Sequence, residues 1–221
     1  ELPASSIEKK TVVNALTAAA QSGHVKVVQV LIGETPTSGS PTKEEEIQIE
    51  TQELRISENF TTEDLMPAFV GAVAEEKVEV IQVLAAKDKN LRHHQEFKDA
   101  FVNAAINKDP EVVEALFLAS VGQNKENSQV TSSIKSSRFL EALNGAVYHD
   151  DNQDISADDS PKLDTINALL RHARISGDKP GQDDVTVKIQ TENLSEILTI
   201  ASQRGDVNAV KALYEASIYK K

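Results

Sequence analysis

The sequence predicts an all-α protein assembled from repeated helix pairs. Five segments share one pattern: a short alanine-rich helix, a polar turn, and a second short helix with apolar residues at helical spacing. These segments lie near residues 12–33, 65–86, 97–119, 139–173 and 194–217. One helix pair cannot bury its own apolar stripe, whereas stacked pairs can. We therefore expect a single domain over residues 1–221, built as a helix-pair solenoid of about five divergent repeats.

Equivalent positions in the five segments carry equivalent side chains. The first helix has one small residue at a fixed place, where it lets neighbouring helices approach closely: Ala19, Ala72, Ala104, Ala146 and Ala201. The second helix has an apolar pair at another fixed place: Val27/Val28, Val80/Ile81, Val112/Val113 and Ala209/Val210. A leucine closes each second helix: Leu31, Leu84, Leu116, Leu169 and Leu213.

The segment Leu-Thr-Ile-Ala-Ser-Gln-Arg-Gly-Asp-Val-Asn-Ala-Val-Lys-Ala-Leu, residues 198–213, resembles the ankyrin repeat. The closing leucines Leu84 and Leu116 are 32 residues apart, close to the ankyrin period of about 33. The Thr-Pro-Leu-His opening of that family is absent, and its turn glycine is present only as Gly23 and Gly205. A helix-pair solenoid of another kind is the alternative.

Four insertions separate or interrupt the repeats, near residues 34–60, 121–137, 150–161 and 177–191. Apolar and polar residues alternate within 44–56 and within 184–190, which predicts strands. Ankyrin proteins join consecutive repeats by hairpin-like fingers, so the resemblance implies β-hairpin fingers at these two places. The insertion at 121–137 is polar and is interpreted as a loop. The insertion at 150–161 falls between the two helices of the fourth repeat, so it should emerge on another side.

Three short patterns predict helix starts. Ser5-x-x-Glu8, Thr61-x-x-Asp64 and Asn193-x-x-Glu196 each place an N-cap residue three positions before an acid.

The composition excludes several classes of protein. Lys and Arg number 23 against 35 Asp and Glu, a formal charge of −12, so the chain repels nucleic-acid phosphates. The absence of cysteine excludes disulfides and thiolate chemistry, and fits a cytoplasmic protein. No apolar run approaches the ~20 residues that cross a bilayer. Secretion into a host cell is the alternative location.

The sequence offers few residues for catalysis or metal binding. The run from Asp150 to Asp159 is acidic, but an EF-hand starting at Asp150 would have Ile155 in place of its glycine and Pro161 in place of its glutamate. His93 and His94 are adjacent, which points them to different faces of a helix. No catalytic motif is present. We expect no enzyme activity and no cofactor, with an enzyme or calcium site in the insertions as the alternative.

The ankyrin resemblance implies a non-catalytic protein–protein interaction module that binds through its fingers and the concave face of its first helices. The candidate partner-binding residues are Gln21, His24, Glu44, Glu45, Glu46, Tyr148, Asp150, Asp151, Gln203 and Arg204. Several are acidic, which favours a protein partner with a basic surface. We expect no nucleic acid, membrane or small-molecule substrate, and a monomer. A pathogen effector is one biological setting for the same function.

Overall fold

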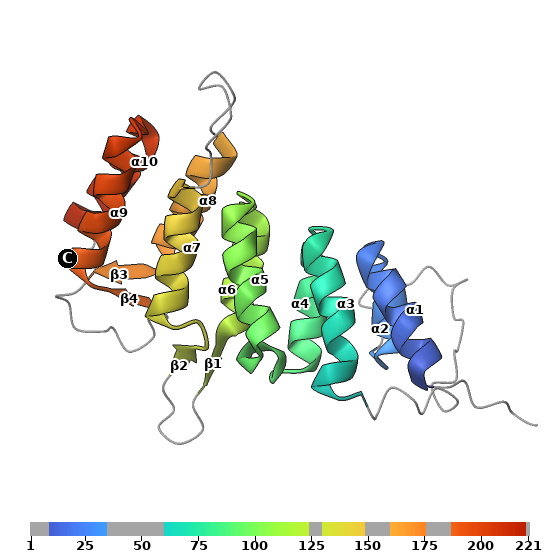
Figure 1. Ribbon diagram of the computed structural model, residues 1–221. Coiled ribbons are helices and arrows are strands. Elements are labelled where there is room, and N and C mark those ends of the chain that lie inside the picture. The colour runs from blue at the N-terminus through green and yellow to red at the C-terminus, as the bar shows by residue number, and fades with distance from the viewer. Residues whose placement is uncertain (1–8, 35–59, 124–129, 149–159, 176–186, 220–221) are drawn as a thin grey trace, which may run out of the picture. The chain divides into compact units, whose positions relative to one another are not determined.

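The computed structural model describes residues 9–34, 60–123, 130–148, 160–175 and 187–219, and these are mostly helical (Figure 1). This confirms the all-α class. The chain divides near Leu91 into two compact units, residues 1–91 and 92–221, and each is described here by itself.

The described residues of unit 1 form two helix pairs. The first pair is α1 (Lys9–Gln21) and α2 (Val25–Leu31), and the second is α3 (Thr62–Ala74) and α4 (Val78–Lys87). Helix α1 packs along α3, and α2 packs along α4, so first and second helices form separate layers. A short 3₁₀ helix, η2 (Leu91–His93), begins where the two units meet along the chain.

The described part of unit 2 forms three helix pairs. Its elements are α5 (Gln95–Ile106), α6 (Pro110–Ser120), β1 (Val121–Gln123), β2 (Val130–Ser132), α7 (Ser136–Tyr148), α8 (Ser160–Arg171), β3 (Ala173–Ile175), β4 (Val187–Ile189), α9 (Thr191–Gln203) and α10 (Val207–Tyr219). The first helices α5, α7 and α9 lie side by side in one layer. The second helices α6, α8 and α10 form the other layer.

A tight turn with one left-handed residue joins the two helices of four pairs. The residue is Gly23 (φ 71°) or Gly205 (φ 71°) in two of them, but Glu76 (φ 57°) and Lys108 (φ 63°) in the others. Side chains with a Cβ are disfavoured in this region, whereas glycine is not. The turn geometry is therefore the same whether or not the sequence supplies glycine.

The predicted N-cap at Thr61 is confirmed. Its backbone N–H donates to Asp64 Oδ2 over 2.7 Å, and its hydroxyl donates to the same oxygen over 2.9 Å. Lys9 of α1 also forms an ion pair with this carboxylate. The cap therefore ties the start of α3 to the neighbouring first helix.

The small residues of the first helices are all buried, as their spacing predicts, with exposed fractions of at most 7%. Leu31 ends α2 and is half-buried, whereas the next residue, Ile32, is fully buried. Unit 2 adds an aromatic core in which the ring centroids of Phe101, Phe117 and Phe139 lie 6.2–6.4 Å apart. Such separations suit tilted and edge-on ring contacts.

The polar loop predicted over 121–137 is wrong in part. Strands β1 and β2 pair antiparallel there, with Val121 opposite Ser132, and the Ser133 N–H donates to the Ser120 carbonyl over 3.0 Å. Backbone pairing does not require apolar side chains, so a polar composition did not prevent it.

The strand predicted within 184–190 is confirmed as β4, but the hairpin predicted for it is wrong. Strand β4 pairs parallel with β3, Ala173 lying opposite Val187 and Ile175 opposite Ile189. Ala173, Val187 and Ile189 are buried, so packing against unit 2 holds both strands. The strand predicted over 44–56 lies outside the described residues, as do Ser5 and Glu8.

The N-cap predicted at Asn193 is also wrong. Helix α9 begins at Thr191 with Gln190 before it, and the Leu194 N–H already donates to the Gln190 carbonyl over 3.3 Å. Strand β4 ends at Ile189, so the chain enters the helix as soon as the strand ends.

Candidate functional site

A groove lies between the parallel first helices α7 and α9 of unit 2. It has a volume of about 320 Å³ and is lined by Ser137, Leu140, Glu141, Asn144, Asn193, Glu196, Ile197 and Ile200. Its apolar residues are buried or half-buried, whereas most of the polar ones are exposed. The groove thus has an apolar floor and a polar rim.

One position that lines the groove differs between α9 and the preceding first helix, α7. Gly145 in α7 packs so closely on α5 that a Cβ added to it would lie 2.6 Å from Ile106 Cγ1. Ile200 occupies the equivalent position in α9, counted from the buried alanines Ala146 and Ala201. Ile200 lines the groove, and α9 packs less extensively on α7 than α7 does on α5. The groove therefore lies where an isoleucine replaces the glycine of the preceding first helix.

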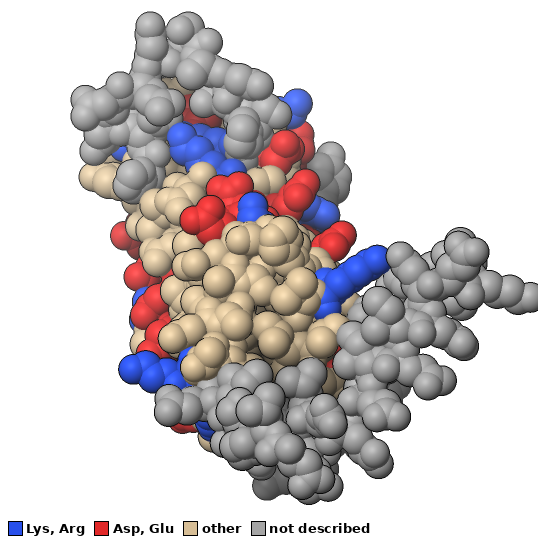
Figure 2. Space-filling model, turned by 90° about the vertical axis from the view of Figure 1, so that its right-hand side faces the viewer, with Lys and Arg blue, Asp and Glu red and all other residues tan. Residues whose placement is uncertain are grey.

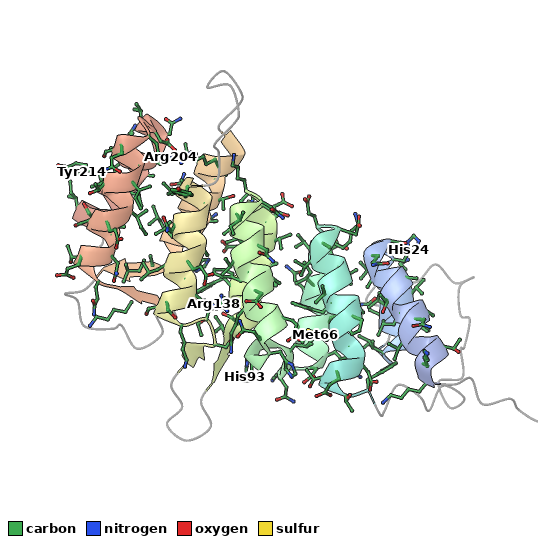
Figure 3. All side chains as sticks on the ribbon, viewed as in Figure 1. His24, Met66, His93, Arg138, Arg204 and Tyr214 are labelled. Atoms are coloured by element: carbon green, nitrogen blue, oxygen red, sulfur yellow. The ribbon has the colours of Figure 1, made fainter. Side chains whose placement is uncertain are left out.

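The rim of the groove carries an excess of negative charge. Arg138 on α7 (Figure 3) lies 2.7 Å from Glu141 Oε2 and 3.0 Å from Asp99 Oδ1, so one cation serves two carboxylates. Glu196 on α9 is exposed and forms no ion pair with the described residues. A cationic group on a partner can therefore meet Glu141 and Glu196 across the groove.

Two predicted partner-binding residues meet beyond one end of the groove. Tyr148 follows Asn144 by one helical turn, and Arg204 follows Ile200 by one turn. The guanidinium carbon of Arg204 lies 5.1 Å from the centre of the Tyr148 ring, within the range of a cation–π contact. Tyr148 remains 54% exposed, so it is open to a partner. Gln203, a third predicted residue, is exposed at the end of α9.

The remaining predicted residues are not brought to this groove. Gln21 is exposed at the end of α1 in unit 1, where its side chain covers Gly71 of α3. His24 precedes α2 and lines a second groove of about 1040 Å³ along α2 and α4, with Glu34 at its margin. The residues that follow Glu34, 35–59, lie outside the described part. Glu44, Glu45, Glu46, Asp150 and Asp151 lie outside the described part as well.

The adjacent histidines show no metal-binding arrangement. His93 is exposed in η2, and partial desolvation together with the charges of Arg92 and Lys98 lowers its pKa. His94 lies 3.9 Å from Glu96. Within the described ranges, no three His, Asp or Glu side chains cluster as metal ligands would. No helix in those ranges is long and apolar enough to span a membrane.

The groove floor was not anticipated from the sequence. Leu140, Ile197 and Ile200 read as ordinary apolar positions of amphipathic helices. Alignment of the repeats could have singled out this position, because Ile200 aligns with Gly71 of α3 and Gly145 of α7. Ile106 is half-buried because it packs against Gly145.

Comparison of the chain with protein-family models, with curated proteins and with solved structures finds no match.

Proposed function

We propose that this protein is a non-catalytic protein–protein interaction module, built as an ankyrin-like solenoid of about five divergent repeats. Short helix pairs, left-handed turn residues within the pairs, and strand pairs between consecutive pairs support this proposal. The layering of first and second helices within each unit supports it too.

The groove between α7 and α9 carries the proposal. Its floor offers Leu140, Ile197 and Ile200 to apolar side chains, and each well-buried anchor contributes roughly 1.5–3 kcal/mol. Its rim offers Glu141 and Glu196 to basic side chains. The partner that fits is a protein segment with apolar residues one helical turn apart and a Lys or Arg beside them. Complementary charge raises the rate of encounter and selects against acidic segments.

A library of displayed peptides tests this function directly. Selection on the purified protein should enrich peptides that combine apolar residues at helical spacing with Lys or Arg. The dissociation constant of an enriched peptide is then measured calorimetrically for wild type, for Ile200→Glu and for Thr199→Glu. Ile200 lines the groove, whereas its neighbour Thr199 is exposed and bonds only within α9.

Ile200→Glu should weaken binding at least about tenfold, because a carboxylate replaces an apolar contact. Thr199→Glu should bind as wild type does, and circular dichroism checks that both variants fold. Affinity should also fall as salt rises, because the rim carboxylates are exposed. Peptides without basic residues, or equal affinity for the two variants, would contradict the proposal.

A further inference from the structure

The last helix of unit 2 presents an apolar stripe to solvent. Val207, Tyr214 and Ile218 of α10 are 76%, 57% and 46% exposed, and their spacing places them on one side of the helix. Figure 3 shows Tyr214 at the edge of unit 2 that lies farthest from α5 and α6. Stacks of repeats normally end in a polar face, because an open apolar face invites association.

The equivalent residue of α6 shows how such a side chain packs inside the unit. Phe117 follows the closing leucine of α6 just as Tyr214 follows that of α10. Phe117 is 1% exposed, and its ring stacks on His172 of the next helix pair with centroids 4.0 Å apart. Tyr214 thus stands where an interior aromatic packs on the following pair, but it is 57% exposed.

Four contacts within unit 2 define how one pair packs on the next. Glu114 of α6 lies 3.0 Å from His172, and Asp99 of α5 lies 3.0 Å from Arg138. Ile106 covers Gly145, and Lys162 lies 2.7 Å from Asp206. In each case a residue of one pair meets a residue of the following pair, so the contacts fix the alignment of consecutive pairs.

The outer side of α1 and α2 suits the role of a following pair. Thr11, Ala15 and Ala18 of α1 are exposed, small and uncharged, and Ala18 occupies the position of Gly145. Val27 of α2 is 48% exposed. Figure 2 shows a broad area without charged side chains where this end of unit 1 faces the viewer.

When the α1/α2 pair of one copy is placed on the α9/α10 pair of another in the alignment seen inside unit 2, complementary side chains come opposite each other. Lys211 is equivalent to Glu114, and Glu34 is equivalent to His172, so a cation and a carboxylate come opposite each other. Gln203 comes opposite the small Ala18. Lys211 and Glu34 form no ion pair with the described residues of their own chain.

We propose that copies of this chain associate head to tail, with the α1/α2 pair of one copy packed on the α9/α10 pair of another. The two faces differ, so the contact does not close a symmetric dimer and can extend to longer stacks. At a high enough concentration, this head-to-tail association replaces the monomer expected from the sequence. The inference is independent of the groove between α7 and α9, because it needs no other protein.

Sedimentation velocity of the full chain alone tests the proposal, over about 5 μM to about 500 μM, a range that covers weak contacts. The weight-average sedimentation coefficient should rise with concentration for wild type. Lys211→Glu and Glu34→Lys each place like charges together and should weaken association at least about tenfold. The double variant restores an ion pair with reversed signs and should recover association.

Lys188→Glu is the matched control, since it makes the same charge change at an exposed residue of β4, outside both faces. It should associate as wild type does, whereas Tyr214→Ser should associate less. A wild type that stays monomeric throughout would overturn the proposal. So would a double variant no better than the single ones, or a control that is weakened equally.

Discussion

Replacing Glu76 by glycine should stabilise the protein. Glu76 joins α3 to α4 with φ 57°, and its side chain is exposed. Its N–H donates to the Val73 carbonyl over 3.1 Å, a bond that glycine keeps. The substitution therefore changes little in the folded state except the strain of a Cβ in the left-handed region.

The size of the gain follows from two opposing terms. A non-glycine residue in this region costs roughly 1–2 kcal/mol. Glycine makes the unfolded chain more flexible, which costs about 0.4–1 kcal/mol. Glu76→Gly should therefore raise the free energy of unfolding by about 0.5–1 kcal/mol. For a chain of this length, that corresponds to a rise in Tm of about 1–4 °C.

Urea denaturation followed by circular dichroism measures the change. Glu76→Ala is the matched control, because it removes the carboxylate but keeps the Cβ, and it should change stability little. Gly205→Ala is the reverse test: its added Cβ meets no atom within 4 Å, so only backbone strain acts, and stability should fall by about 0.5–1 kcal/mol. Equal stabilities of Glu76→Gly and Glu76→Ala would refute the reasoning.

The ion pair of Lys162 with Asp206 is nearly buried, with exposed side-chain fractions of 9% and 10%, so Lys162→Ala should cost about 3 kcal/mol or more by stranding a carboxylate. Arg138→Ala breaks more exposed pairs and should cost below about 1 kcal/mol; equal losses in urea denaturation would contradict this. The pKa of Asp64 is lowered by Lys9 and the Thr61 cap. The stability that this carboxylate contributes is therefore present above pH 3.8 and lost as pH falls through its lowered pKa. Asp64→Asn should be less stable than wild type at neutral pH and equal to it in strong acid, in urea midpoints measured across pH.

Features that depend only on residues close together along the chain were predicted correctly from local sequence patterns. The buried alanines and the cap at Thr61 followed from spacing alone, because helical period and capping geometry span only a few residues. The cap at Asn193 matched the same pattern and was wrong. There the N-cap is Gln190, three residues earlier, where strand β4 ends against the core.

The pairing of β3 with β4 needed contacts that the sequence does not display. Residues 173 and 187 pair parallel because both strands bury side chains against unit 2, and periodicity within one strand does not name its partner. The candidate groove also depends on contacts that the sequence does not display. Leu140 and Ile200 lie in different helices, and the space between them depends on how closely α9 approaches α7.

A helical, acidic chain of repeated pairs could be predicted from the sequence, together with the turn positions and the small residues that let helices pack. Only the folded structure shows that Leu140, Ile197 and Ile200 line one groove, and that Tyr148 and Arg204 meet beyond its end. It also left Tyr214 exposed where Phe117 is covered. The physical reason is that helix formation and capping are local, whereas the distance between helices depends on side chains brought together from distant parts of the chain.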